Sequence, residues 1–326
     1  MESATEQAAD PRLQEAARWA GEMLGIATPQ PSPVSGDASF RRYFRFHDGD
    51  RTLILMDAPP DQEDSAPFVD IAGRLRRAGL NAPEILSFSF EAGFGLVEDF
   101  GDTLYREILD ETSVNELFPG LFDVLQGLAG VETSGLPLYD DALFQTELDL
   151  FTDWYLEHHR GRPLTMAEQA TWRALSRRLI DSAHSQPQVF VHRDFHSCNL
   201  LQTPTGPGII DFQDAVCGPL SYDFASLAWD RYIAWPRDRL EQWMLDLHKR
   251  FDLDCSLGEW IRQCDWMGLQ RNLKIIGIFA RLHYRDGKQG YLDMIPRFYG
   301  YLLDVMPRYP EFNNFLDFLE DPTCAP

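Results

Sequence analysis

Lysine is nearly absent from this sequence: only Lys249, Lys274 and Lys288 occur, so arginine carries almost all of the positive charge. The formal net charge is −22 at pH 7. This balance argues against nucleic acid or an anionic membrane as the main partner, because both require a basic surface. No apolar run approaches the roughly 20 residues of a membrane-spanning helix.

Paired cysteine motifs are absent too. The five cysteines are scattered and none forms a C-x-x-C, which favours free thiols in a reducing compartment over disulfides or a zinc site. The acidic, polar start MESATEQAADPRL is not typical of a secretory signal. We therefore expect a soluble cytoplasmic protein, whose 326 residues suffice for one large domain or two modest ones.

The first hundred residues predict a small antiparallel sheet with helices. Apolar residues at helical spacing follow Asp10, and Ser65 with Pro67 opens a second helix that Gly79 ends. The segments FRRYFRF and RTLILMDA flank the turn HDGD, and EILSFSF and FGLVE flank the turn EAG, so each pair predicts a hairpin. In the first strand, Phe40, Phe44 and Phe46 fall on one side.

From Thr103 onward the pattern is mainly helical, and Thr165 with Glu168 forms a capping box. Three short strand-like pieces, QVFVH, NLLQ and GIID, interrupt it between residues 188 and 211. The sequence therefore predicts an α+β protein with a small β lobe followed by a larger helical lobe. We expect a nucleotide-binding lobe at residues 1–98, a hinge at 99–102, and a helical lobe with the catalytic loop and acceptor site at 103–326.

The segment VHRDFHSCNLL has the spacing of a kinase catalytic loop, H-R-D-x-x-x-x-N, with His192, Arg193, Asp194 and Asn199 in order. The chemistry explains the spacing: a carboxylate must orient the attacking hydroxyl and accept its proton. A few residues later the chain must return, so that an amide oxygen can bind the magnesium of a triphosphate.

A second metal ligand is expected on the next strand. NLLQ-TPTGPG-IID predicts a hairpin that brings Asn199 and Asp211 side by side at its open end, and one Asn with one Asp suits Mg²⁺. A single Asp in either place more often caps a turn or ends a buried strand. The ordered set of Asp194, Asn199, hairpin and Asp211 favours catalysis.

The stretch EDFGD contains the Asp-Phe-Gly of a protein kinase, but it precedes the catalytic loop instead of following it. Its position at the end of the strand FGLVE indicates a hinge. There the backbone of Glu98 to Phe100 could bind an adenine edge, and Gly101 lets the chain turn. The counterpart of the metal-binding segment is DFQD, Asp211–Asp214.

The stretch VHRDFHSCNLL…GIIDFQDAVCGPLSYDFASL resembles the aminoglycoside phosphotransferase-like kinases, which share a two-lobed fold with protein kinases. GDASFRRYFRF, LILMDAPP, LVEDFGD and LQRNLKIIGIFARLHYRDGK further resemble the bacterial anomeric N-acetylmuramate/N-acetylglucosamine kinase group. The resemblance covers residues 34–301. It implies ATP and Mg²⁺ as cofactors, phosphorylation of the anomeric hydroxyl of an amino sugar, and a role in peptidoglycan recycling.

The resemblance also implies residue roles. Asp194 is the catalytic base, and Asn199 and Asp211 hold magnesium. His196 either touches the sugar or supports the loop, and Asp214 is a further candidate for the acceptor site. Asp223, at the start of a helix, is expected to bond the loop backbone.

One departure from the wider kinase pattern concerns the phosphates. Such kinases usually hold them with a Lys on the third strand, and this chain has none before Lys249. We expect Arg41, Arg42 or Arg45 to replace it, with Ser39 and its backbone as a further phosphate contact; surface arginines that only solubilise a strand are the alternative. The strand register decides which arginine points inward, and neither Glu63 nor Asp70 is singled out as its partner.

The acceptor site is expected on a late helix with Arg271, Lys274, Arg281 and His283. N-acetylmuramate carries a lactyl carboxylate, which a cation such as Arg271 or Lys274 would bind. Ordinary salt bridges to the surplus carboxylates are the alternative for these residues.

Two other functions stay open at this point. One is a kinase of another alcohol, such as an aminoglycoside, choline or homoserine. The other is an inactive nucleotide-binding protein, which the missing Lys favours and the complete set of Asp194, Asn199 and Asp211 opposes.

Overall fold

The computed structural model describes residues 10–34, 40–321 and 323–326. The chain divides into two compact units. The first comprises Met1–Glu107 and Cys198–Asp214, and the second comprises Ile108–Ser197 and Ala215–Pro326. Among the described residues, no helix is both long and apolar enough to cross a membrane.

The first unit is built on a five-stranded antiparallel sheet with the strand order β1-β2-β3-β5-β4. A two-stranded hairpin, β7–β8, completes it. Its elements are α2 (Pro11–Leu24), β1 (Ser32–Pro33), β2 (Arg42–Asp48), β3 (Arg51–Asp57), α3 (Ala66–Arg77), β4 (Ile85–Ser89), β5 (Phe94–Glu98), β7 (Leu200–Thr203) and β8 (Gly206–Ile209). The two hairpins predicted before residue 98 are confirmed.

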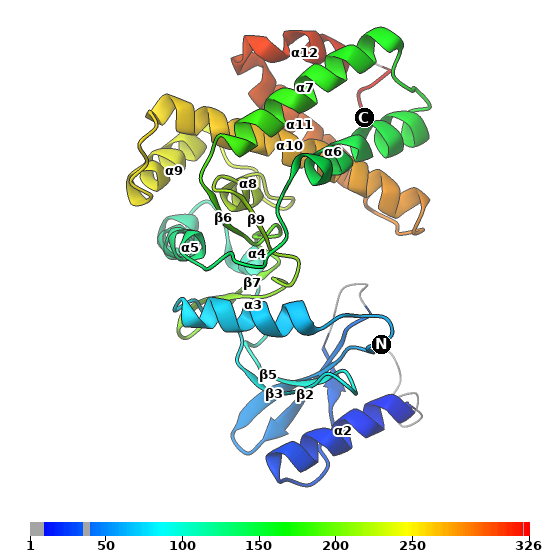
Figure 1. Cartoon of the computed structure of the whole chain (residues 1–326), viewed down its shortest axis with the longest axis vertical. Coiled ribbons are helices and arrows are strands. Elements are labelled where there is room, and N and C mark those ends of the chain that lie inside the picture. The colour runs from blue at the N-terminus through cyan, green and yellow to red at the C-terminus, as the bar shows by residue number, and fades with distance from the viewer. Residues whose placement is uncertain (1–9, 35–39, 322) are drawn as a thin grey trace. The chain divides into compact units, whose positions relative to one another are not determined.

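Helix α2 packs its apolar stripe on one face of this sheet, as Figure 1 shows. Asp10 caps the helix by accepting from the N–H groups of Arg12 and Leu13. The shared core contains Leu13, Ala16, Ala20, Phe44, Phe46, Leu53, Leu55, Phe94 and Leu96. The alternation along β2 therefore buries Phe44 and Phe46 as predicted. Phe40 lies outside the strand and is 63% exposed, so its expected place on that face is wrong.

Hairpin β7–β8 packs with the sheet-bearing unit, although it is far from the sheet in sequence. The Phe68 ring of α3 stacks on Phe212 at 5.3 Å between centroids. The Phe100 ring covers Gly208, where an added Cβ would lie 2.7 Å from a ring carbon. The N–H of Gln202 donates to Thr103 O at 2.8 Å. The segment after β5 and the hairpin are therefore one packed piece, while the boundaries expected at residues 98 and 102 remain a prediction about function.

The second unit is mainly helical. Its longer helices are α5 (Val114–Ala129), α6 (Asp141–Leu150), the π-helix η1 (Phe151–His159), α7 (Met166–His184), α8 (Tyr222–Ala228), α9 (Arg237–Arg250), α10 (Leu257–Tyr284), α11 (Ile295–Val305) and α12 (Asn313–Leu319). Short helices α4 (Tyr105–Ile108), η2 (Leu292–Met294), η3 (Met306–Arg308) and η4 (Pro310–Phe312) complete the set. The capping box predicted at Thr165 and Glu168 is present at the start of α7.

Helix α10 is the centre of this unit, and α6, η1, α7, α8, α9 and α11 pack around it (Figure 1). Gly277 lets η1 approach closely, because a Cβ there would lie 2.3 Å from the backbone of Leu150. Strand β6 (Gln188–Val191) pairs with β9 (Val216–Pro219). The sequence predicted β6, but it missed β9, whose Gly218 and Pro219 weaken the strand pattern.

Candidate active site

The catalytic loop begins directly after β6. Asp223, at the start of α8, accepts from the backbone N–H of His192 at 2.7 Å and of Arg193 at 3.0 Å. This confirms the expectation that Asp223 bonds the loop backbone. Burial raises the pKa of Asp223 to about 6, although His192 and the two N–H donors act in the opposite direction. A buried carboxylate therefore fixes the loop just before Asp194.

A second buried carboxylate fixes the other end of the loop. Asp230 accepts from Ser197 N at 3.1 Å and from Ser197 Oγ at 2.7 Å. The hydroxyl of Tyr301 donates to the carbonyl of Asp230 at 2.9 Å. Sequence reasoning missed Asp230, whose only signal is an acidic residue just after the mainly apolar helix α8.

Asp194 itself is exposed to solvent on this anchored loop. Desolvation by neighbouring protein atoms opposes its ionisation, but the charges of Lys274, His196, Arg271 and His192 bring the pKa of Asp194 below its ordinary value. Burial lowers the pKa of His196. Near neutral pH the site therefore presents an ionised carboxylate beside a neutral imidazole, the state that a proton acceptor requires.

A buried ion-pair network lies behind this loop. Glu147 of α6 is 4% exposed and accepts from Arg193 Nη2 at 2.7 Å and from Lys274 Nζ at 2.7 Å. Tyr139 and Gln270 also donate to this carboxylate. Burial disfavours the ionised form, yet Lys274 and Arg193 bring the pKa of Glu147 below its ordinary value.

Arg193 has a left-handed backbone with φ of 74°, which is costly for a residue with a side chain. We call Glu147, Arg193 and Lys274 the loop network, because it attaches the residue before Asp194 to α6 and α10. The sequence did not single out Glu147, since a Glu within a helix is ordinarily a surface residue.

The predicted metal ligands meet at the open end of hairpin β7–β8. Ile210 N donates to Asn199 O at 3.1 Å, and Asn199 Nδ2 lies 3.3 Å from Asp211 Oδ2. The side-by-side placement inferred from the hairpin is confirmed. Asp211 has φ of 63°, so it too occupies a strained backbone position.

This pair fits magnesium better than a transition metal. Among the described residues, no group of three or more His, Cys, Asp or Glu side chains could hold a metal ion. Mg²⁺ instead binds one or two protein oxygens and fills its remaining positions with phosphate oxygens and water. The carboxylate of Asp211 and the amide of Asn199 offer that small set of hard ligands.

The arginines before and on β2 have different partners. Arg41 is buried, and its Nη2 lies 2.7 Å from Glu63 Oε1. Burial raises the pKa of Tyr43; the charge of Arg41 and its hydrogen bond to Tyr43 lower it, and the charge of Asp211 raises it. The sequence had not singled out Glu63, because it precedes helix α3 instead of lying on it.

Arg42 and Arg45 are held elsewhere by carboxylates. Arg42 donates to Asp57 Oδ2 and to Asp10 Oδ2, each at 2.5 Å from one of its Nη atoms. Arg45 donates to Asp99 Oδ2 at 2.6 Å and to Asp102 Oδ2 at 2.6 Å. These bonds argue against a phosphate-binding role for Arg42. They give the two aspartates of EDFGD, Asp99 and Asp102, a structural function.

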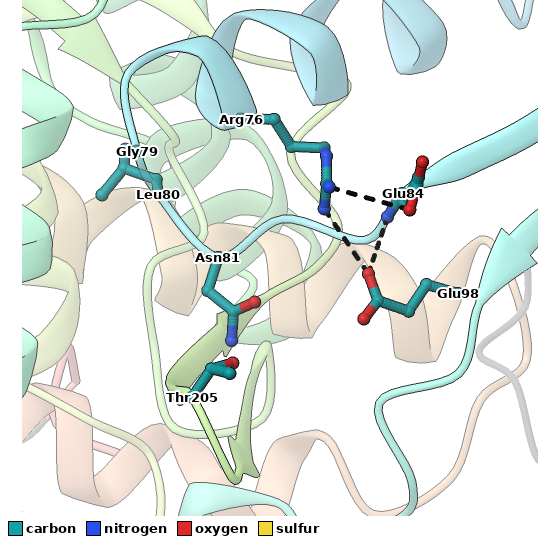
Figure 2. A pocket seen from close by; sticks show the side chains of 7 residues that line it. All are labelled: Arg76, Gly79, Leu80, Asn81, Glu84, Glu98 and Thr205. Carbon is teal, nitrogen blue, oxygen red and sulfur yellow. Dashed lines mark hydrogen bonds and ion pairs between the residues drawn. The ribbon is translucent and has the colours of Figure 1, made fainter.

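The predicted hinge residue Glu98 is also engaged. Its N–H donates to Glu84 O at 2.8 Å, and its Oε2 accepts from Glu84 N at 3.0 Å. Figure 2 shows the adjoining pocket of about 410 Å³, where Arg76 pairs with Glu84 and Glu98 and where Asn81 and Thr205 form part of the wall. The N–H of Glu98 is therefore already engaged by the backbone of the first unit, and the adenine-binding role expected for residues 98–100 stays a prediction.

The remaining predicted residues fall in different places. Ser39 lies outside the described residues. Asp214 is exposed at the end of the DFQD segment. Lys274 donates to Glu147 and to the Tyr222 hydroxyl at 3.1 Å, so salt bridging accounts for this cation. Arg271 is 4% exposed, and its Nε and Nη1 have no hydrogen-bond partner among the described residues.

Comparison with known proteins adds three findings. Residues 31–255 match the phosphotransferase enzyme family. The N-acetylmuramate/N-acetylglucosamine kinase of Pseudomonas aeruginosa is 45% identical over 285 residues, covering 86% of this chain and 84% of the relative. The protein of the same name from Pseudomonas putida is 40% identical over 318 residues, covering 93% and 94%.

The fold has solved counterparts at much lower identity. The ethanolamine kinase of Plasmodium vivax superposes with a TM-score of 0.66 at 12% identity, over 94% of this chain and 91% of that one. The predicted α+β, protein-kinase-like fold class is thus confirmed.

Proposed function

The chain belongs to the phosphotransferase enzyme family, and from this premise we propose that it transfers the γ-phosphoryl group of ATP to the anomeric hydroxyl of N-acetylmuramate and N-acetylglucosamine. The observation that carries the proposal is the 45% identity, over most of both chains, to a kinase named for these two sugars. Asp194, Asn199 and Asp211 are all present in this chain. The product would be a sugar 1-phosphate, as the recycling of peptidoglycan amino sugars requires.

Asp194 acts as the base. The anomeric oxygen forms a bond to the γ-phosphorus while the bond from that phosphorus to the β–γ bridging oxygen breaks, and ADP leaves. The hydroxyl proton passes to the Asp194 carboxylate, whose lowered pKa keeps it ionised and ready to accept. Asp223, Asp230 and the loop network hold this carboxylate in place, so little reorganisation is needed during the reaction.

Asn199 and Asp211 would hold Mg²⁺, which when bound would neutralise phosphate charge. Their attachment to one hairpin supports this assignment, since the backbone bond between Ile210 and Asn199 fixes their spacing. Removal of divalent ions with EDTA should abolish turnover, and MgCl₂ should restore it.

Arg41 would take the place of the phosphate-binding Lys. A Lys in this role is commonly paired with a Glu, and the buried Arg41–Glu63 pair offers the same combination of charges. The charge of Asp211 contributes to raising the pKa of Tyr43, which is hydrogen-bonded to Arg41. This supports a position of Arg41 near the metal-bound phosphates. Arg42 and Arg45 lack this environment because their guanidinium groups are held by Asp10, Asp57, Asp99 and Asp102.

An assay of ADP release tests the function. The protein would be incubated with ATP, MgCl₂ and, separately, N-acetylmuramate, N-acetylglucosamine, kanamycin, choline and homoserine. We expect turnover with the two amino sugars and none with their 1-O-methyl glycosides, which lack the anomeric hydroxyl. Turnover restricted to one of the other three alcohols would replace this proposal, and no turnover at all would favour an inactive nucleotide-binding protein.

The phosphate assignment has its own test. Arg41→Met should raise the KM for ATP by about 10- to 100-fold, the effect of losing hydrogen bonds to a charged group. Arg51→Met is the control, because Arg51 lies on the neighbouring strand β3 and pairs with Asp48. If Arg42→Met raises that KM while Arg41→Met leaves it unchanged, Arg42 holds the phosphates.

A further inference from the structure

Two cations of helix α10 have contrasting surroundings. Arg271 and Lys274 are three residues apart, and the Arg271 Cζ and the Lys274 Nζ each lie 5.8 Å from the centroid of the Tyr222 ring. Lys274 is balanced by Glu147 at 2.7 Å. Arg271 is more deeply buried than Lys274, but no hydrogen bond satisfies its Nε or its Nη1 among the described residues.

An unsatisfied guanidinium in such a place requires an explanation. Burying a charged donor without a partner is strongly unfavourable, and most buried polar groups in folded proteins are hydrogen-bonded. Neighbouring helices supply Lys274 with a carboxylate but supply none to these two nitrogens of Arg271. The planar guanidinium can give a carboxylate two parallel hydrogen bonds, through Nη2 together with either Nε or Nη1, so a bound carboxylate would satisfy one of the two unused donors.

Arg271 also lies beside the catalytic loop. The Tyr222 ring that it covers is adjacent in sequence to Asp223, which binds the N–H groups of His192 and Arg193. Asp194 follows in the chain, and the charge of Arg271 contributes to lowering its pKa. The two unsatisfied donors of Arg271 therefore belong to the same compact unit as the base that must contact the acceptor.

We propose that Arg271 binds the lactyl carboxylate of N-acetylmuramate and so sets the preference for this sugar over N-acetylglucosamine. The inference rests on the proposed function, which supplies the two acceptors. Arg271 is not among the residues proposed to bind phosphate or magnesium, which are Arg41, Asn199 and Asp211. Of the two acceptors, only N-acetylmuramate carries a carboxylate.

The test compares kcat/KM for the two sugars in wild type, Arg271→Met and Arg271→Lys. Arg271→Met should lower the ratio of N-acetylmuramate to N-acetylglucosamine activity by about 10- to 100-fold, as expected for lost hydrogen bonds to a charged group. Arg271→Lys keeps the charge but loses the two-point geometry, so its ratio should fall by a smaller factor. Arg262→Met is the matched control, because Arg262 lies on the same helix and pairs with Glu259.

Equal losses on both sugars, or an unchanged ratio, would overturn the inference, since Arg271 would then serve a group that both reactions share. If Arg271→Met does not fold, as judged by circular dichroism and thermal melting, the ratio measured for Arg271→Lys decides. Failure of the proposed function is distinguishable: in that case wild type phosphorylates neither amino sugar. If wild type phosphorylates both sugars and the Arg271 variants keep its ratio of kcat/KM for the two sugars, only this inference is overturned and the proposed function stands.

Discussion

Each compact unit contains a buried carboxylate held by two cations, but the two carboxylates stabilise different parts of the protein. In the first unit, Asp57 is fully buried and binds Arg12 and Arg42. In the second, Glu147 binds Arg193 and Lys274. The first group ties helix α2 to the sheet, whereas the second ties α6 and α10 to the residue that precedes Asp194.

The comparison teaches that a buried ion pair does not by itself mark an active site. Removing one member of either group should be costly, because the remaining charges stay buried without compensation. What distinguishes the groups is the backbone to which the cations are attached. Arg12 and Arg42 lie on scaffold elements, while Arg193 belongs to the catalytic loop and has a strained backbone.

The largest effect is expected at the residue that the loop network serves. Asp194→Asn should lower kcat by about 1000-fold, since the amide cannot accept the hydroxyl proton. Its melting temperature should remain close to wild type, because the side chain is exposed. Steady-state kinetics on N-acetylglucosamine would measure the change, with the exposed Asp61→Asn as control. A wild-type kcat for Asp194→Asn would contradict the proposed role of Asp194 as the base.

The next largest effect tests the loop network directly. Glu147→Gln should lower kcat by about 100-fold, because Arg193 and Lys274 lose their shared counter-charge and the loop shifts. The KM for ATP should change little. Asp149→Asn, on the same helix but bonded to Gln145 and Trp172, is the matched control. If Glu147→Gln has the same kcat as Asp149→Asn, the loop network has only a structural role.

The corresponding change in the first unit should affect stability and spare catalysis. Asp57→Asn should lower the free energy of unfolding by about 3 kcal/mol, the cost of breaking a buried ion pair. Its kcat, measured at a temperature where the protein is folded, should match wild type. Urea unfolding and initial rates provide the two measurements. A loss of kcat as large as that of Glu147→Gln would remove the contrast between the two units.

The smallest expected effect is a pH dependence of the wild-type protein, which requires no substitution. The pKa of Asp223 is raised from 3.8 to about 6, so kcat should fall below about pH 6 as protonation weakens its bonds to His192 and Arg193. Stability should respond with the opposite sign: the contribution of protonated Asp223 is present below pH 3.8 and is lost as the pH rises through about 6.

A pH–rate profile of wild type and Asp223→Asn measures this effect. The variant should have a lower maximum and should lose the acidic limb near pH 6. An unchanged limb in Asp223→Asn would assign it to another group, such as His196.

Much of the fold followed from local patterns. The alternation through Phe44 and Phe46, the turn at HDGD and the capping box at Thr165 each involve residues close in sequence, and the structure contains all three features. The placement of Asn199 beside Asp211 was also predictable, because a short hairpin fixes which residues face each other.

The residues that the sequence did not reveal act over long separations. Glu147 meets Lys274 across 127 positions, and Asp230 meets Ser197 across 33. Glu63 could not be paired with Arg41 from the pattern, because it precedes the helix on which such a partner is expected. Each of these acids resembles many others in a chain that carries 51 acidic residues.

The sequence by itself determined which residues are proposed for the chemistry, namely the base and the metal ligands in their order along the chain, since these residues lie on one loop and one hairpin. Only the tertiary structure decided which cations are balanced. Arg41 and Arg42 are neighbours in sequence, yet one pairs with Glu63 and the other with Asp57 and Asp10. Lys274 pairs with Glu147, whereas Nε and Nη1 of Arg271 have no hydrogen-bond partner among the described residues, because partner distance depends on how distant segments pack around α10.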